Sequence, residues 1–224
     1  MLIERMPPIY IAIEGAIGVG KTTLASLLQP QYNASLMLEV FEENPFLSLF
    51  YQEPERYAFQ VQIEFLLSRY HQQQAICEQA GKVSMVSDYL FAKDRLFAGM
   101  NLQGHEWRTY DRLHHVLAEQ IAAPDLVIYL RANVDTLMAR IAQRGRSYER
   151  SMSRDYIARL AEVYDGYFSS YTATPLLTID TDNLNVITCP DDLALICHLI
   201  QQKMRRRYQW AEPFVPNGHV VSNL

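Results

Sequence analysis

The residues with the clearest chemistry lie in the segment GAIGVGKTT, which begins at Gly15. It fits the pattern G-x-x-x-x-G-K-[ST], with Gly20, Lys21 and Thr22 in the other fixed places. In such a loop, backbone N–H groups and the N-terminus of the following helix bind phosphate, and the lysine adds a mobile cation. The threonine hydroxyl suits the Mg²⁺ that accompanies a nucleoside triphosphate. We therefore expect a nucleoside triphosphate to bind at nine residues: Gly15, Ala16, Ile17, Gly18, Val19, Gly20, Lys21, Thr22 and Thr23.

Acidic residues follow two other apolar segments. Glu42 and Glu43 come just past SLMLEV, and Asp88 ends VSMVSD. Adjacent side chains diverge, so only one of the two glutamates can point into a cleft, where its carboxylate would accept a proton from an alcohol. Asp88 is placed to bind Mg²⁺ through water. Helix caps and turns use the same residue types, so these roles depend on context.

Three arginines lie near the end of one predicted helix. The stretch RIAQRGR puts Arg140 and Arg144 on one helical face and Arg146 just beyond Gly145. Guanidinium groups placed in this way favour a mobile lid that closes over phosphates. A solvated basic helix end is the alternative.

The predicted helix at 57–76 carries a polar face. Gln62, Phe65, Leu66 and Arg69 fall at i, i+3, i+4 and i+7, so they share one side of the helix. An amide, an aromatic ring and a guanidinium together can read the edge of a nucleobase and pack on its ring. A partly solvated helix face is an equally good interpretation of this pattern alone.

Five apolar segments alternate with helical ones and must position these residues. The apolar segments are PIYIAIE, SLMLEVF, VSMVSD, DLVIYLR and PLLTID. Helical periodicity occurs at 57–76, 106–121, 134–143 and 153–167, and again at about 191–206. The alternation predicts an α/β fold with a parallel sheet covered on both faces, and ligands bind such folds at the carboxyl ends of the strands. We expect one domain at 1–207 and an irregular tail at 208–224.

Composition excludes several classes of protein. The 224 residues are 49% hydrophobic, and no apolar run approaches the roughly 20 residues that span a bilayer. There is no signal-peptide pattern, so we expect a cytoplasmic protein without a membrane partner. The formal net charge of −5 argues against nucleic acid as the main partner.

Five segments in order carry a family resemblance: GAIGVGKTT, EVFEENPFL, FYQEPERYAFQVQIEFLLSRY, SDYLFAKDRLFAGMNL and RGRSYE. Together they resemble the bacterial deoxyribonucleoside kinases, close to deoxyguanosine and deoxyadenosine kinases. The resemblance implies transfer of the γ-phosphate of ATP to the 5′-hydroxyl of a deoxynucleoside, with Mg²⁺. It also implies a P-loop kinase fold with a five-stranded parallel sheet and an arginine-rich lid at about 140–150. A homodimer is expected, or a heterodimer with a paralogue.

The resemblance assigns the catalytic residues one by one. Glu43, rather than Glu42, aligns with the general base at the family's Glu-Pro-Val motif. Asp88 matches the acid of the Glu/Asp-Arg-Ser motif. The lysine of the loop and the lid arginines complete the catalytic set: Lys21, Arg140, Arg144 and Arg146.

The resemblance also assigns the acceptor site. Tyr51 matches the tyrosine that contacts the sugar 3′-hydroxyl, and Glu149 matches its acidic partner. Gln62 corresponds to the glutamine that hydrogen-bonds the base. Arg69 and Asp94 match a pair that lies over the base in members that accept purines.

The chain departs from the family at Tyr89, where many relatives carry arginine after the acid. In those relatives the arginine lies near the 5′-hydroxyl and the phosphate. Its role here is either absent or supplied by another cation, for which Lys93 is the candidate.

Several activities share this motif set. Arg69 and Asp94 favour purines, but the same pair can serve deoxycytidine or a broad-specificity kinase, and Phe65 restricts the pocket in either case. A thymidylate kinase-type enzyme would need cations for the acceptor's phosphate, which the acidic Glu42 and Glu43 disfavour. The sequence lacks the N/T-K-x-D and D-x-x-G motifs of GTP-dependent switch proteins. Intact Lys21, Glu43 and lid arginines disfavour a silent nucleotide-binding subunit.

Overall fold

The computed structural model describes residues 7–40, 43–146, 149 and 152–208. In these residues, five strands form one parallel sheet in the order β2-β3-β1-β4-β5. The strands are β1 (Tyr10–Glu14), β2 (Ser35–Met37), β3 (Met85–Ser87), β4 (Leu126–Arg131) and β5 (Leu176–Asp180). Each strand lies within one of the five predicted apolar segments, so the predicted sheet is confirmed.

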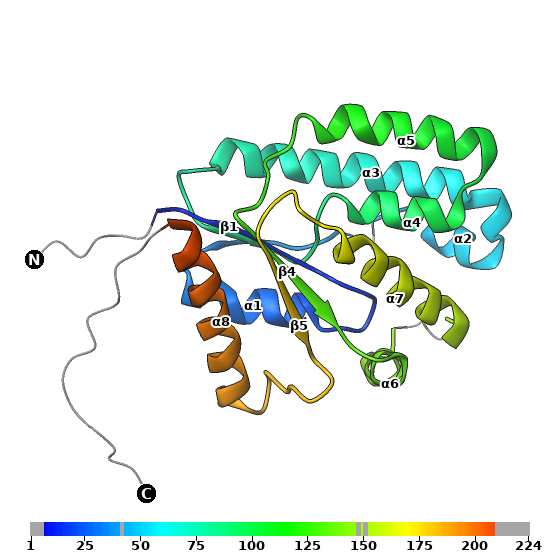
Figure 1. The fold of residues 1–224 in the computed structure, drawn as a ribbon. Helices are drawn as coiled ribbons and strands as arrows, with labels where there is room; N and C mark the ends of the chain where they lie inside the picture. The colour runs from blue at the N-terminus through cyan, green and yellow to red at the C-terminus, as the bar shows by residue number, and fades with distance from the viewer. Residues whose placement is uncertain (1–6, 41–42, 147–148, 150–151, 209–224) are drawn as a thin grey trace, which may run out of the picture.

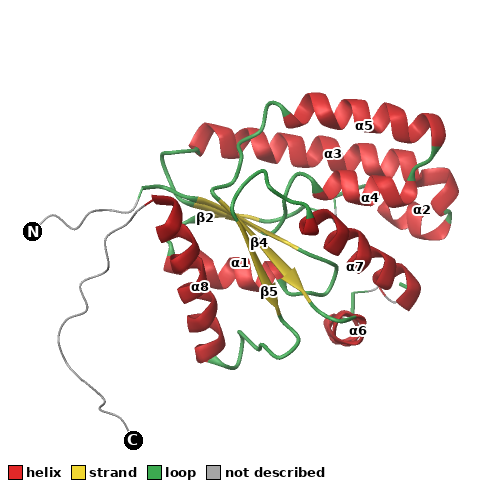
Figure 2. Cartoon of the chain, viewed as in Figure 1, coloured by secondary structure: helices red, strands yellow, loops and turns green. Residues whose placement is uncertain are grey.

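Helices cover both faces of the sheet. They are α1 (Lys21–Gln31), α2 (Leu47–Gln52), α3 (Pro54–Gln79), α4 (Lys93–Asn101), α5 (Gly104–Ala118), α6 (Val134–Arg144), α7 (Arg154–Ser169) and α8 (Pro190–Tyr208). Figure 1 shows α1 and α8 on one side of the sheet and α3, α4, α5 and α7 on the other. Figure 2 shows the strands between these two layers. Two of the helices, α2 and α4, lie in segments for which the sequence pattern predicted none.

The central strands are buried because helices cover both of their faces. All five residues of β1 are buried, and so are the first five of β4. Parallel strands enclosed in this way are continuously apolar, as YIAIE and LVIYL nearly are. Among the described residues, no helix combines the length and apolar character needed to cross a membrane. Residues 209–224 of the predicted tail lie outside the described part of the chain.

Gly15 is required where β1 turns into the phosphate-binding loop. Its φ is +150°, and a Cβ at this position would lie 2.2 Å from the backbone carbonyl oxygen of Leu130. A backbone atom that is held within β4 cannot move aside cheaply. The glycine therefore lets the loop cross directly over the end of the neighbouring strand.

Replacing Gly15 with alanine should lower the free energy of unfolding by about 3 kcal/mol or more, because the clash adds to backbone strain. Gly81→Ala is the matched control, since Gly81 has a φ of +74° but no atom within 4 Å of its Cβ position. Its cost should stay near 1 to 2 kcal/mol, roughly the left-handed strain alone. Urea unfolding of both variants measures the difference, and equal losses would contradict the steric argument.

His114 gives the fold a second testable property. Its ring is 6% exposed and stacks on Phe91, with ring centroids 4.9 Å apart. Burial lowers the pKa of His114 from 6.5 to about 4, so the folded protein holds this ring neutral. An unfolded histidine binds a proton near its ordinary pKa, so this contribution to stability is complete above pH 6.5 and is lost as the pH falls toward 4.

At about pH 5 we expect His114 to cost the wild-type protein roughly 2 kcal/mol of stability relative to neutral pH. His114→Gln should remove that part of the acid dependence. His71→Gln, at an exposed histidine of α3, should leave it unchanged. Urea unfolding at the two pH values tests this, and parallel pH profiles for wild type and His114→Gln would contradict it.

Candidate active site

One pocket lies where the phosphate-binding loop, α3, α4 and the segment after α6 converge. Its lining includes most of the predicted site: Ile17, Gly18, Lys21, Thr22, Tyr51, Gln62, Phe65, Arg69, Asp88, Arg144, Arg146 and Glu149. Glu39 and Lys93 also line the pocket, and in space they lie between the phosphate loop and α3. The structure therefore brings together segments that are far apart in the sequence.

The phosphate end of the pocket is built on the junction of β1 and α1. The Lys21 ammonium donates hydrogen bonds to the carbonyl oxygens of Gly15, at 2.7 Å, and Ala16, at 3.1 Å. Burial, and then the nearby charge of Lys93, lower the pKa of Lys21 to about 8. An ammonium held by neutral carbonyls close to another cation favours the approach of an anion.

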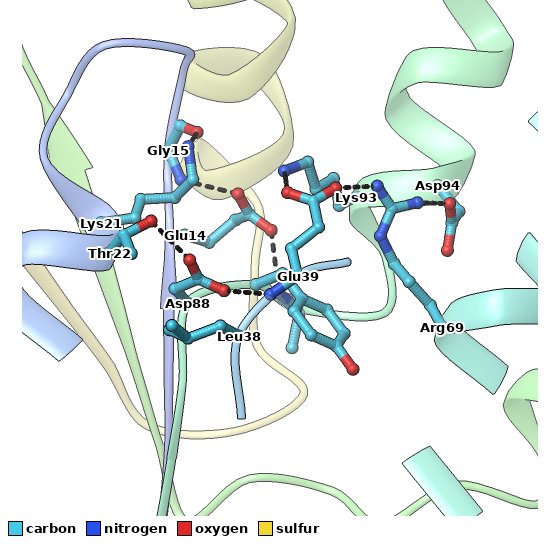
Figure 3. A network of polar contacts seen from close by, with 12 residues as sticks. Glu14, Gly15, Lys21, Thr22, Leu38, Glu39, Arg69, Asp88, Lys93 and Asp94 are labelled. Atoms are coloured by element: carbon cyan, nitrogen blue, oxygen red, sulfur yellow. Dashed lines mark hydrogen bonds and ion pairs between the residues drawn. The ribbon is translucent and has the colours of Figure 1, made fainter. Parts of the chain in front are cut away.

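Glu14 fixes the base of this loop. It is fully buried, and its carboxylate accepts hydrogen bonds from the backbone N–H groups of Gly15 and Leu90, both at 2.8 Å, and from the Tyr164 hydroxyl at 3.0 Å. Figure 3 shows this carboxylate between the loop and the segment that follows β3. Glu14 thereby ties the loop to the strand end that carries Asp88.

Thr22 and Asp88 meet at the phosphate end of the pocket. The Thr22 hydroxyl donates to Asp88 Oδ2 at 2.5 Å, and Asp88 Oδ1 accepts from the backbone N–H of Glu39 at 2.8 Å (Figure 3). A hydroxyl and a carboxylate are the hard oxygen ligands that Mg²⁺ prefers when phosphates complete its shell. Within the described residues, no group of three or more His, Cys, Asp or Glu side chains could hold a metal alone. These two residues therefore fit Mg²⁺ that arrives with a nucleotide.

The acid at the centre of the pocket is Glu39. It lies two residues past β2, and its side chain is 14% exposed. Its Oε1 accepts a hydrogen bond from Arg69, and its Oε2 accepts one from Lys93 at 2.5 Å. Burial alone would raise the pKa of Glu39, but the Lys93 and Arg69 cations hold it well below its usual range.

Glu43, the predicted base, does not reach the pocket. It is exposed in the turn before α2 and is absent from the pocket lining, while Glu42 lies outside the described residues. The apolar run SLMLEVF suggested a strand through Phe41, but the strand ends at Met37. The first acid past β2 is consequently Glu39, which lies inside the predicted strand and has no predicted role.

The far end of the pocket holds the residues predicted to read a nucleobase. Arg69 pairs with Asp94, which is fully buried at the start of α4 (Figure 3). The Arg69 guanidinium also lies over the Phe65 ring, 4.9 Å from its centroid. Gln62 is 3% exposed on the same face of α3. The predicted helix face is thus an internal polar surface that lines the pocket, although Asp94 reaches it only through Arg69.

Two of the three predicted lid arginines, Arg144 and Arg146, pair with Glu149. Arg144 donates from Nε to Glu149 Oε2 at 3.1 Å, and Arg146 Nη1 lies 3.7 Å from Glu149 Oε1. Gly145, with a φ of 69°, ends α6 and turns the chain so that both arginines line the pocket. Residues 147, 148 and 150 of the predicted lid lie outside the described part.

Arg140 does not line the pocket, contrary to its assignment to the lid. Its guanidinium donates to the Thr181 hydroxyl at 2.9 Å and to the Thr181 carbonyl at 2.7 Å. It also donates to the Val19 carbonyl at 3.3 Å. Arg140 therefore braces the phosphate loop against the segment after β5, one helical turn away from Arg144.

Comparison with known proteins places the chain among nucleoside kinases. A family model described as deoxynucleoside kinase matches residues 11–204. The chain is 31% identical to a deoxyguanosine kinase of Bacillus subtilis, over 86% of this chain and 96% of the relative. It is 32% identical to a deoxyadenosine/deoxycytidine kinase of the same organism, over 86% of this chain and 95% of that one.

A solved structure shows the same fold with products bound. It is a deoxyadenosine kinase from M. mycoides with dCMP and a flexible dCDP, with a TM-score of 0.76 and 25% identity. The match covers 87% of this chain and all of the other. The P-loop kinase fold that the sequence predicts is confirmed by this likeness and by the five-stranded sheet.

Proposed function

The chain belongs to the deoxynucleoside kinase family, and on that premise we propose that it uses ATP to phosphorylate the 5′-hydroxyl of a purine deoxyribonucleoside. The observation that carries this proposal is a pocket with the phosphate-binding loop at one end and the buried Arg69 and Gln62 at the other, with Asp94 paired to Arg69 behind it. A nucleoside lying between them presents its 5′-hydroxyl to Glu39 and its base to α3.

Glu39 is our candidate for the general base, in place of Glu43. A neutral alcohol is a weak nucleophile, so a carboxylate that accepts its proton as the new bond forms accelerates the reaction. Glu39 is ionised and lies in the pocket between the loop and the base-reading residues. When the substrate binds, its 5′-hydroxyl would donate to Glu39 and replace part of the hydrogen bonding that Arg69 and Lys93 supply to this carboxylate.

Cations around the phosphates stabilise the charge that develops during transfer. We assign this role to Lys21 in the loop and to Arg144 and Arg146 after α6. Thr22 and Asp88 would hold Mg²⁺, which neutralises charge on the nucleotide phosphates when it is bound. Tyr51 and Glu149, which pairs with the lid arginines, line the pocket, and we assign them to the clamping of the sugar.

A purine fits the chemistry at the far end best. A glutamine amide can hydrogen-bond both the N6 amino group and N7 of adenine, and a guanidinium can donate to guanine O6 and N7. Deoxycytidine is the second candidate, because one relative is named for both deoxyadenosine and deoxycytidine.

The acceptor is tested by ADP release from Mg-ATP with each of the four deoxynucleosides, the matching ribonucleosides and dTMP. We expect deoxyadenosine or deoxyguanosine to give the highest kcat/KM and dTMP to give none. Fastest turnover of deoxycytidine would replace the purine assignment, and turnover of dTMP alone would refute the nucleoside kinase proposal.

The same proposal includes a homodimer, or a heterodimer with a paralogue, and a cytoplasmic role in nucleotide salvage. Leu67 on α3 and Val116 on α5 are large apolar side chains that are 39% and 56% exposed. A dimer that packs these two helices against their copies would cover both side chains. Sedimentation of the purified chain tests it, since a monomer at all concentrations would exclude the homodimer.

A further inference from the structure

We infer that Lys93 is a catalytic cation that contacts the transferring phosphoryl group, in the role that many relatives give to the arginine missing at position 89. This inference rests on the proposed kinase function and names one further residue for it. It concerns a side chain at the start of α4, whose ammonium lies against Glu39 in the pocket.

Position 89 itself cannot supply the charge. Tyr89 is fully buried, and its ring centroid lies 6.0 Å from the Arg69 guanidinium. Within the described part of the chain, its hydroxyl has no hydrogen-bond partner. The tyrosine is thus part of the interior behind the base-reading residues. A cation for the phosphate end must come from another position.

Lys93 is held where such a cation is needed. Its side chain is 7% exposed, and its ammonium lies 2.5 Å from Glu39 Oε2. The same ammonium lies over the Phe97 ring, 5.7 Å from the centroid, which restrains the lysine within the pocket. An ammonium has three donors, so one can serve Glu39 while another reaches a phosphoryl oxygen.

Lys93 and Lys21 face the same region. After burial, the charge of Lys93 is the largest influence that lowers the pKa of Lys21, so the two ammonium groups repel each other across the pocket. Glu39 already pairs with Lys93, and a further anion that contacts both ammonium groups would be stabilised by the two charges. The γ-phosphate of a nucleotide in the loop is an anion of the right kind at this place.

The proposed step moves one phosphoryl group and one proton. The 5′-oxygen attacks the γ-phosphorus, and its proton passes to Glu39. The bond from the γ-phosphorus to the bridging oxygen breaks, and its electron pair stays on ADP. Lys93 keeps its proton throughout and donates to an oxygen of the phosphoryl group, whose charge it stabilises.

The test compares Lys93→Met with wild type and with Lys82→Met, a control at an exposed lysine whose ammonium bonds only the Glu78 carbonyl among the contacts described. We expect Lys93→Met to lower kcat by about 10²- to 10³-fold, the usual effect of losing one such donor. The Kd of the deoxynucleoside should change by less than about threefold. Lys93→Arg should recover at least roughly tenfold of the loss, because it restores a cation.

A transition-state analogue separates a catalytic role from a structural one. Affinity for ADP and aluminium fluoride in the presence of the deoxynucleoside should fall in Lys93→Met by about the same factor as kcat. Unchanged affinity for this analogue, or a kcat within about threefold of wild type, would overturn the Lys93 assignment. Lys93→Gln replaces Lys93→Met if the latter does not fold, with the same expectations.

Failure of the proposed function has a different signature. If wild type and Lys82→Met both phosphorylate no deoxynucleoside, the kinase proposal falls, and the Lys93 assignment falls with it. If both are active and Lys93→Met is equally active, only the Lys93 assignment is lost.

Discussion

Replacing Glu39 with glutamine should lower kcat by about 10²- to 10⁴-fold, as expected when a general base is removed. Glutamine keeps the shape of the side chain, but its one amide oxygen can accept from Arg69 or from Lys93 and not from both, as the carboxylate does. We therefore expect some loss of stability beside the loss of kcat, while the nucleoside still binds. The measurement is kcat together with the Kd of the deoxynucleoside, with thermal unfolding as the check on folding.

Glu43→Gln is the matched control, because it makes the same change at an exposed acid outside the pocket lining. We expect its kcat to stay within about twofold of wild type. A large loss in Glu43→Gln together with an active Glu39→Gln would return the base to the position that the motif alignment indicated. It would also mean that the turn before α2 moves into the pocket when substrate binds.

Replacing Asp94 with asparagine should lower the free energy of unfolding by about 3 kcal/mol, because it removes one of the two carboxylates that pair with the buried Arg69 and leaves only Glu39. Asp94 is fully buried and Arg69 is 4% exposed, so water cannot compensate. The kcat/KM for the preferred purine should fall as well, because Arg69 would no longer be held in position to meet the base.

The surface pair of Arg95 and Asp111 provides the control. Its atoms are 2.7 Å apart, and the two side chains are 43% and 27% exposed. Asp111→Asn should cost less than about 1 kcal/mol, as for other exposed ion pairs. Urea unfolding of the two variants compares them directly. Equal costs would show that the buried pair does not stabilise the fold. A purine kcat/KM that survives Asp94→Asn would show that the pair does not read the base.

Local patterns predicted most of the fold. The five strands and the phosphate loop were found because each has a pattern within a few residues: continuous apolar runs and fixed glycine spacing. The helix α4 was missed, although it carries Lys93 and Asp94. Its sequence KDRLFAGMN contains a glycine, Gly99, whose packing against Trp107 depends on the tertiary structure.

The site was less predictable because its assignments depend on where elements end. The predicted second strand ended four residues later than β2 does. Glu39 therefore fell inside the predicted strand, and Glu43 was taken as the acid beyond it. Helical spacing put Arg140 and Arg144 on one face, but only the turn at Gly145 and the approach of Thr181 decide that Arg144 lines the pocket and Arg140 does not. The pairing of Lys93 with Glu39 joins two segments 54 residues apart, which no local pattern contains.

The central claim is that this pocket transfers a phosphoryl group from ATP to the 5′-oxygen of a purine deoxyribonucleoside. Its most direct test is the fate of a label in the γ-phosphate of ATP, followed with deoxyadenosine and deoxyguanosine as separate acceptors. We expect one labelled 5′-monophosphate to form for each ADP released. Label released as inorganic phosphate, or ADP formed equally well without a nucleoside, would contradict the account.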